Sequence, residues 1–234
     1  MILKEVESSN NYAMALVKEG RAQTGQGFLA LKQTQGKGRR GRQWVSEEGA
    51  NVLLTLIQDM RWIKVFHQFQ LSVATAIGLY DLVVASVKEN VFLKWPNDLY
   101  IGDKKAAGIL IENLVVGNKW QWAVIGVGVN VNQEVFGKNL AATSIKKITG
   151  TNHDIIQLAQ KLKNCVEDRI QELKSGKYTA LLNLYNDRLY KKNCVVKFRK
   201  GNEEIATVVK EVSPGGELIT EDGNLKYDEI DWVK

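Results

Sequence analysis

The sequence is poor in the residues that build disulfide frameworks and most metal sites. Its 234 residues include two cysteines, Cys165 and Cys194, and two histidines, His67 and His153. Two isolated cysteines are too few for a disulfide scaffold or a zinc site, and two distant histidines do not form a histidine-rich metal cluster. We expect both histidines to lie at helix starts, both cysteines to lie in the core, and no metal to be bound by protein side chains alone.

Proline and long apolar runs are also scarce. The chain has only two prolines and 20 glycines, which argues against a disordered, collagen-like or linker-rich protein. No stretch approaches roughly 18 uninterrupted apolar residues, so no membrane partner is expected, and residues 1–5 lack the features of a signal peptide. With 44% hydrophobic and 25% charged residues, the chain is expected to be a globular cytoplasmic protein.

Positive charge is concentrated in one short segment. The net charge is +6, and five basic residues without any acidic one lie between positions 32 and 46: Lys32, Lys37, Arg39, Arg40 and Arg42. From Arg188 onward, nine basic residues are balanced by nine acidic ones. A DNA-binding protein usually spreads its positive charge along a face or a recognition helix. This distribution favours a small, multiply charged anion as ligand over a nucleic-acid duplex.

The hydrophobic pattern predicts a large domain of helices and strands followed by a small β domain. Helices are expected over residues 8–19, 66–87, 154–173 and 178–189, and strands over 28–33, 51–57, 91–95, 99–101, 105–116 and 119–131. Short strands over 195–198, 205–212, 218–220 and 225–227 follow, separated by glycine-containing turns. We therefore expect one domain over residues 1–187 and an SH3-like β barrel over residues 188–234.

The segment from Gly36 to Arg42, here called the basic glycine loop, contains the pattern GxGxxG. A dinucleotide-binding fingerprint needs a helix directly after its glycines, but a strand is expected here. A phosphate-binding P-loop would need Lys and Ser or Thr where Arg42 and Gln43 stand. Glycines let backbone amides approach a ligand, and arginines bind carboxylates and phosphates. The loop is either a solvated basic turn or an anion site that is mobile when empty and closes over its ligand.

A second segment carries a resemblance to a known family. Lys94-Trp95-Pro96-Asn97-Asp98 is followed by Lys105-Ala106-Ala107-Gly108-Ile109-Leu110-Ile111-Glu112. Together with the basic glycine loop, these residues resemble the biotin protein ligases, also called biotin–[acetyl-CoA-carboxylase] ligases. Further matches are Glu7-Ser8-Ser9-Asn10, Gln33 and Gly126-Val127-Gly128-Val129-Asn130. The resemblance runs from about residue 2 to the end of the sequence.

This resemblance implies a fold and an activity. The implied fold is α+β: a mixed, largely antiparallel sheet with packed helices, similar to class II synthetases, plus a small C-terminal SH3-like β barrel. The implied enzyme uses ATP and Mg²⁺ to activate biotin as biotinyl-5′-AMP, and transfers biotin to one lysine of a biotin carboxyl carrier domain. Because the first motif begins near residue 7, the chain resembles the monofunctional type without an N-terminal DNA-binding domain. No repressor function and no specific nucleic-acid partner are expected, and the protein is expected to be a monomer or a homodimer.

The resemblance also assigns residues to roles. The catalytic residues it implies are Arg39, Lys94, Asp98 and Lys105. The biotin-binding residues it implies are Ser8, Ser9, Asn10, Gln33, Lys37, Gly38, Arg39 and Lys105. The residues implied for ATP or the adenylate are Arg39, Arg40, Arg42, Trp44, Lys94, Asn97 and Asn130, with Trp44 stacked on adenine. The family usually has arginine at the position of Lys37, so this chain keeps the charge there but loses the planar fork.

Several of these residues keep a plain structural alternative. Ser8 and Ser9 also suit the N-terminal cap of a helix, and Asn130 also suits a turn. Asp98 is expected either to orient the acceptor lysine or to help bind Mg²⁺. Glu112, on a strand that is otherwise apolar, is either a paired core acid or a group on the metal side.

Two other functions are weighed against biotin ligation. A lipoate–protein ligase shares the fold and the adenylate chemistry, but lipoate has no ureido ring to explain the polar group of Ser8, Ser9, Asn10 and Gln33. A nucleic-acid-binding regulator would need a recognition helix or exposed aromatic residues on the β barrel. The neutral charge of residues 188–234 argues against that function.

Overall fold

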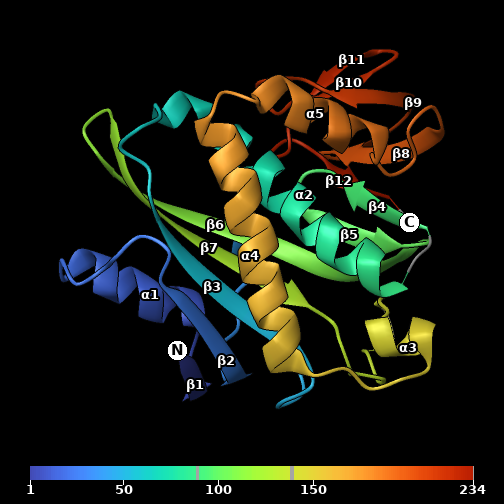
Figure 1. Ribbon diagram of the computed structural model, residues 1–234. Helices are drawn as coiled ribbons and strands as arrows, with labels where there is room; N and C mark the ends of the chain where they lie inside the picture. Colours follow the sequence, from blue (N-terminus) through green and yellow to red (C-terminus); the bar gives the residue numbers. More distant parts are fainter. Residues whose placement is uncertain (88–89, 138–139, 234) are drawn as a thin grey trace.

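The computed structural model of the protein describes residues 1–87, 90–137 and 140–233. Its largest element is a seven-stranded sheet with the order β1-β2-β3-β7-β6-β5-β4 (Figure 1). The strands are β1 (Ile2–Val6), β2 (Gly27–Gln33), β3 (Val52–Asp59), β4 (Val91–Lys94), β5 (Asp98–Ile101), β6 (Lys104–Val116) and β7 (Lys119–Val129). The pair β1 and β2 is parallel, whereas the other neighbouring strands of this sheet run antiparallel. The expected α+β fold with a mixed, largely antiparallel sheet is confirmed.

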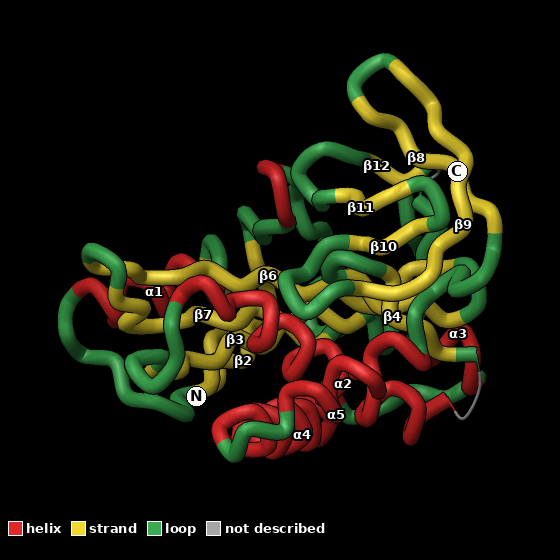
Figure 2. Tube along the Cα trace, turned by 90° about the horizontal axis from the view of Figure 1, so that it is seen from above, coloured by secondary structure: helices red, strands yellow, loops and turns green. Residues whose placement is uncertain are grey.

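Helices cover both faces of this sheet. They are α1 (Ser9–Lys18), α2 (Gln68–Val87), α3 (Ile145–Thr149), α4 (Ile155–Lys174) and α5 (Tyr178–Asp187), with short 3₁₀ turns η1 (Arg39–Gly41) and η2 (Val65–His67). Because side chains alternate along a strand, Ile57 faces α1 while Leu56 faces the core under α2 and α4. Figure 2 shows α2, α4 and α5 together on one side of the sheet.

Helix α2 is the most apolar element of the chain. By length and composition, the segment Val65–Val87 is sufficient to cross a membrane, but most of it is buried inside the protein. It packs against both the sheet and α4, and an apolar helix with this position needs no lipid to cover it. Gly78 lies at the crossing with α4, where an added Cβ would come within 2.7 Å of the Val166 Cα atom.

A second, five-stranded antiparallel sheet follows. Its strands are β8 (Val195–Lys200), β9 (Glu203–Val212), β10 (Leu218–Thr220), β11 (Gly223–Leu225) and β12 (Asp231–Trp232). It is joined to the first domain by hydrogen bonds from Trp95 Nε1 to the Gly216 carbonyl (3.0 Å) and from Trp232 Nε1 to the Trp95 carbonyl (2.9 Å). Buried side chains of the two sheets form one continuous hydrophobic core. The C-terminal β domain is therefore firmly seated on the first domain.

The structure also corrects parts of the sequence-based prediction. Strand β1, helix α3 and strand β12 were not expected, and the strand predicted over residues 225–227 lies instead at Gly223–Leu225. Both histidines precede helices as expected, at η2 and at the cap of α4. The prediction of a buried Cys194 is wrong because its side chain is exposed, and Cys165 is half-buried. The boundary between residues 187 and 188 stays a prediction, and residue 234 lies outside the described residues.

Replacing Gly78 with alanine is expected to lower the free energy of unfolding by about 1–3 kcal/mol, because the new methyl group meets rigid backbone atoms of α4. Alanine is intrinsically better than glycine in a helix, so a loss of stability would report the crowding alone. Urea unfolding of the two proteins measures the difference. Ala85→Ser, at an exposed position of the same helix, is the control and should change stability by no more than about 0.5 kcal/mol. A Gly78→Ala protein as stable as the wild type would contradict the close contact.

Candidate active site

A buried network of polar side chains lies where the start of α1 meets the sheet. The backbone N–H and the hydroxyl of Ser9 both donate to Gln33 Oε1, at 2.7 and 3.0 Å. The Thr55 hydroxyl lies 2.7 Å from Ser9 Oγ and 2.9 Å from Asn10 Oδ1. Asn10 Nδ2 in turn donates to Glu112 Oε2 at 2.9 Å. The structure thus gathers three predicted residues into one network and adds Thr55 and Glu112 to it.

Of the two roles that the sequence left open for Ser8 and Ser9, Ser8 caps the helix and Ser9 joins the polar network. Ser8 has extended backbone angles and caps α1, because its side chain accepts a hydrogen bond from the Asn11 N–H. Ser9 is the first residue of the helix, and its hydroxyl points into the polar network. Thr55 was missed because a single threonine in the strand Val52–Asp59 is an ordinary β residue. The available signal was its polarity in a strand whose neighbours are apolar and buried.

Glycines on β6 and β7 let other groups lie directly on the sheet. An added Cβ at Gly126 would stand 2.9 Å from Asn10 Cγ, and one at Gly128 would stand 2.7 Å from the Trp44 ring. Gly108 is the cross-strand partner of Gly128, and its added Cβ would be 3.1 Å from the same ring. Trp44 therefore rests on a pair of glycines. Among the described residues, its buried Nε1 has no hydrogen-bond partner.

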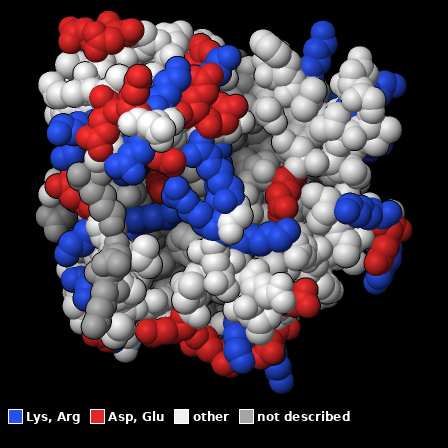
Figure 3. Space-filling view, turned by 180° about the vertical axis from the view of Figure 1, so that it is seen from behind, with Lys and Arg blue, Asp and Glu red and all other residues white. Residues whose placement is uncertain are grey.

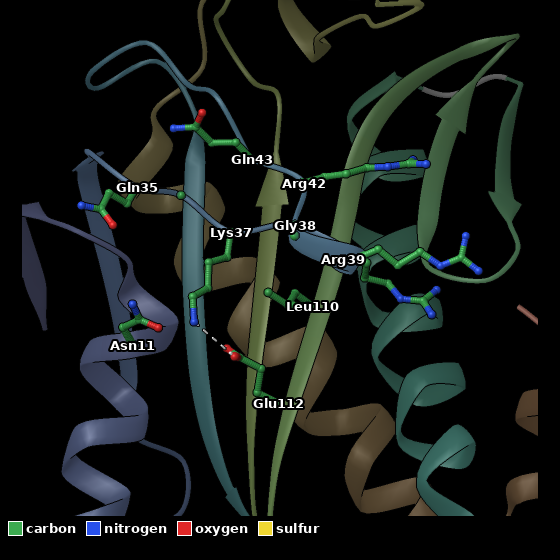
Figure 4. A pocket seen from close by; sticks show the side chains of 12 residues that line it. Asn11, Gln35, Lys37, Gly38, Arg39, Arg42, Gln43, Leu110 and Glu112 are labelled. Atoms are coloured by element: carbon green, nitrogen blue, oxygen red, sulfur yellow. Dashed lines mark ion pairs between the residues drawn. The ribbon is translucent and has the colours of Figure 1, made fainter. Parts of the chain in front are cut away.

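The basic glycine loop is folded back on itself above the sheet. The Gly38 N–H donates to the Arg42 carbonyl at 2.7 Å, and the Trp44 N–H donates to the Gly36 carbonyl at 2.9 Å. The turn passes through Arg40, whose φ of +54° lies in the left-handed region. The loop forms one side of an open cleft of about 780 Å³, whose other side includes Asn11, Leu110 and Glu112 (Figure 4).

The basic side chains of the loop point in two directions. Lys37 points toward Glu112, with its Nζ 3.5 Å from Oε1, whereas Arg39 and Arg42 point to the opposite side of the loop (Figure 4). Arg39 Nη1 donates to Asn97 Oδ1 at 3.2 Å, and burial lowers the pKa of Arg39 from its ordinary value. The structure thus brings Arg39 and Asn97 together, as two predicted site residues from distant motifs.

Arg40 and Arg42 line the cleft and also contact the C-terminal domain. Arg40 Nη1 and Arg42 Nη2 lie 3.0 and 3.1 Å from the same oxygen of Asp231. On one face of the molecule, basic and acidic side chains gather side by side around a hollow (Figure 3). The positive charge that the sequence concentrates in one segment is therefore partly neutralised by acids from elsewhere in the chain.

Lys105 and Asp98 form a close ion pair beside the loop. Lys105 Nζ lies 2.6 Å from Asp98 Oδ1, and both side chains are largely buried. The Lys105 ammonium also lies 5.5 Å from the centre of the Trp44 ring. Asp98 opens strand β5 and pairs with Gly108 of β6, so the register of these strands places the two motif segments together.

Lys94 is enclosed by aromatic rings. Its Nζ lies 4.5, 5.4 and 4.6 Å from the ring centres of Tyr100, Tyr190 and Trp232, and it donates to the Tyr100 hydroxyl at 3.2 Å. Burial lowers the pKa of Lys94 to about 8, and the nearby negative charge of Asp98 offsets part of that effect. Two of the three rings belong to residues beyond α5. The expected position of this ammonium beside phosphate groups stays a prediction.

Asn130 is buried at the end of β7. Its Nδ2 donates to the Thr143 carbonyl at 3.0 Å, and its backbone N–H donates to the Ala106 carbonyl at 2.8 Å. These bonds fix the segment before α3 against β6, so Asn130 has a structural role, although it does not lie in the turn that the sequence suggested. Its expected contact with adenine stays a prediction.

The acids near the cleft do not form a metal cluster. No group of three or more His, Cys, Asp or Glu side chains suited to a metal ion occurs within residues 1–87, 90–137 and 140–233. The carboxylates nearest the cleft, Asp98 and Glu112, are each paired with a lysine. They are oxygen donors of the kind that bind Mg²⁺ jointly with substrate phosphates.

The site joins two chemical environments, one neutral and polar and one positively charged. The polar network around Ser9 and Asn10 suits a neutral ligand with both N–H and carbonyl groups. The adjoining cations, Lys37, Arg39 and Lys105, suit carboxylate or phosphate oxygens. A molecule carrying a polar ring at one end and an acid at the other matches this layout.

The chain resembles known proteins in sequence and in structure. The sequence profile of the biotin/lipoate A/B protein ligase family matches residues 3–130. The bifunctional ligase/repressor BirA of Salmonella typhimurium is 32% identical, over 96% of this chain and 70% of its own length. BirA of Bacillus spizizenii is 30% identical over 79% of this chain, which spans 58% of that protein. The structure of a biotin protein ligase from Aquifex aeolicus in complex with biotin and ATP superposes with a TM-score of 0.84, at 24% identity over 100% of this chain and 98% of that one.

The aromatic surroundings of Lys94 give a direct test by titration. We expect the Lys94 side chain to lose its proton near pH 8. Replacing Trp232 with leucine opens the enclosure, and since burial is the main cause of the lowered pKa, the value should rise toward 10.5. NMR of lysine labelled with ¹³C at Cε follows the titration. Trp62→Leu, which removes an exposed tryptophan near Lys174, is the control and should leave the Lys94 curve unchanged. A wild-type Lys94 that stays protonated up to pH 10 would contradict the assignment.

Proposed function

This chain belongs to the biotin/lipoate A/B protein ligase family, and we propose that within it the protein is a biotin protein ligase. It activates biotin with ATP as biotinyl-5′-AMP and transfers the biotinyl group to a lysine of a carrier domain. The observation that carries this proposal is the buried network of Ser9, Asn10, Gln33 and Thr55 beside the Lys105–Asp98 pair. It supplies a neutral polar network close to a charged pair that can receive an anion, and Glu112, which lines the cleft, contacts this network.

The polar network supports biotin as the acid. The ureido ring of biotin has two N–H donors and one carbonyl acceptor, all neutral. Gln33 Oε1 and Ser9 Oγ are acceptors fixed by their own hydrogen bonds, and the Thr55 hydroxyl lies between Ser9 and Asn10. Buried polar groups of this kind reject a ligand that leaves them unpaired. Lipoate has no ureido ring, so it would form none of the hydrogen bonds that a ureido ring offers to this network.

The first step joins two negatively charged substrates. An oxygen of the biotin carboxylate attacks the α-phosphorus of ATP, the bond to the bridging oxygen breaks, and pyrophosphate leaves with that electron pair. The protein's part is to offset the charge that gathers as the two anions meet. Lys105, which pairs with Asp98, and Arg39, which donates to Asn97, are the cations that would do this. Mg²⁺ accompanying the nucleotide would add positive charge at the phosphates, with Asp98 or Glu112 as oxygen ligands.

The second step transfers the acyl group to an amine. The amine of the carrier lysine attacks the acyl carbon, AMP leaves, and the amine loses a proton. A free lysine has a pKa of about 10.4, so the attacking amine must be neutralised first. Asp98, whose Oδ1 lies 2.6 Å from Lys105 Nζ, is the carboxylate that would orient this amine. The carrier domain and a cytoplasmic location stay predictions, as does the lack of a repressor function.

A direct test of the reaction is the exchange of labelled pyrophosphate into ATP, with biotin, lipoate or no acid present. We expect exchange with biotin alone, because the reverse of the first step remakes ATP from bound adenylate. Asn10→Ala should raise the concentration of biotin needed for half-maximal exchange, since it removes the hydrogen bonds of Asn10 with Thr55 and Glu112. Exchange driven by lipoate would identify a lipoate ligase instead. A folded protein without exchange in any arm would refute the adenylation reaction.

A second test compares two adjacent lysines. Replacing Lys105 with glutamine is expected to slow adenylate formation by about 10²–10³-fold, the usual loss when one donor to a transition-state oxyanion is removed. Lys104 precedes it on the same strand, is exposed, and is paired with Ile101 across the sheet. Lys104→Gln therefore serves as the matched control and should retain near-normal rates. Single-turnover formation of the adenylate is the measurement, and a loss below tenfold for Lys105→Gln would remove it from the proposed role.

A further inference from the structure

Three arginines of the basic glycine loop converge on one short segment of the C-terminal domain. Arg40 and Arg42 share the Asp231 carboxylate, at 3.0 and 3.1 Å. Arg40 also donates to the backbone carbonyls of Ile230 and Tyr227. The guanidinium of Arg39 lies 4.4 Å above the centre of the Tyr227 ring. The segment from Tyr227 to Asp231 is here called the arginine platform.

The arginine platform is itself firmly held. Ile230 is buried in the hydrophobic core, and Asp231 is paired with Arg199 in the register of β12 and β8. The next residue, Trp232, donates to the Trp95 carbonyl and packs 4.7 Å from Phe198, centre to centre. The platform is therefore tied both to its own sheet and to the motif that carries Asn97 and Asp98. A loop that docks on it takes up a defined place relative to that motif.

Two effects oppose an ordered loop when these contacts are absent. Three arginines within four residues repel one another, and a glycine-containing loop has high conformational entropy when free. Asp231 offsets the first by serving as a shared counterion. The backbone carbonyls and the Tyr227 ring offset the second, because they fix the directions of the guanidinium groups.

We propose that Asp231 is a positioning residue that docks the basic glycine loop on the C-terminal domain before substrate binds. Arg39 is then held at the cleft by its contacts with the Asn97 side-chain amide and the Tyr227 ring. A preorganised loop lowers the ordering cost that a nucleotide must offset on binding. This proposal is opposite to the sequence-based expectation that the loop is mobile when empty, and its kinetic part depends on the proposed adenylation reaction.

The docked state is tested with trypsin, which cleaves after arginine and needs an opened loop. Asp231→Asn keeps the size of the side chain and removes its charge, so the empty protein should be cut in the loop about three- to tenfold faster, as expected from losing two partly exposed ion pairs. Asp231→Glu restores a carboxylate and should return cleavage toward the wild-type rate. Glu204→Gln, which removes a 3.2 Å ion pair with Arg199 inside the same domain, is the matched control and should not change cleavage in the loop.

Kinetics provide the second readout. In the pyrophosphate exchange assay, Asp231→Asn should raise the KM for ATP about three- to tenfold with little change in kcat, and Asp231→Glu should reverse most of this rise. Cleavage of the loop at the wild-type rate would overturn the docking proposal. A lower KM for ATP would overturn it as well, since Asp231 would then compete with phosphate for the arginines.

The two outcomes separate this proposal from the proposed function. If the wild-type protein shows no exchange, the adenylation reaction is refuted, whereas the proteolysis series still decides whether Asp231 docks the loop. Thermal unfolding of each variant shows whether a change in cleavage reflects the loop or the whole protein. A fall in the unfolding midpoint for Asp231→Asn beyond that of Glu204→Gln, with cleavage outside the loop, would assign Asp231 to general stability and overturn the proposal.

Discussion

Closely spaced positive charges repel one another, and the rest of this site supplies the acidic partners that offset this repulsion. Lys37 is paired with Glu112, Lys105 with Asp98, and two loop arginines with Asp231. Each of these acids comes from a different element, so the cleft is assembled from strands β5, β6 and β12 as much as from the loop. A substrate anion thus enters a region whose cations already have partners. Its net binding free energy is the difference between the new ion pairs and those that it replaces.

One face of the sheet has glycines, and therefore no side chains, at neighbouring positions of β6 and β7. Gly126 and Gly128 are two residues apart on β7, so they share a face, and Gly108 lies beside Gly128 on β6. With no side chains at these points, the Asn10 amide and the Trp44 ring approach the backbone closely. The start of α1 and the loop are thereby brought within reach of Glu112 and Lys105. The polar network and the anion site are adjacent because both rest on this bare strip of the sheet.

Much of the fold was predictable from the sequence, because α4 has a regular helical spacing of apolar residues and α2 is a long, almost continuously apolar segment. Strands β6 and β7 are long β-rich runs separated by the Gly117-Asn118 turn. Strand β1 was missed because its five residues are mostly charged or exposed, and β12 because it has only two residues. At the site, the motifs identified the loop and the Lys94–Asp98 turn. The partners Asp231 and Tyr227 were not predictable, since their roles arise from contacts with residues far away in the sequence, and Thr55 was marked only by its polarity in an apolar strand.

The distance along the chain between Arg40 and its partner has a consequence for biosynthesis. These two residues are 191 positions apart, and Asn10 is 102 positions from Glu112. A ribosome adds about 5–20 residues per second, so the loop is made roughly 10–40 s before Asp231 exists. The contacts of Arg40 and Arg42 with Asp231 therefore form last, after the residues of the polar network and of the Lys105–Asp98 pair have all been made.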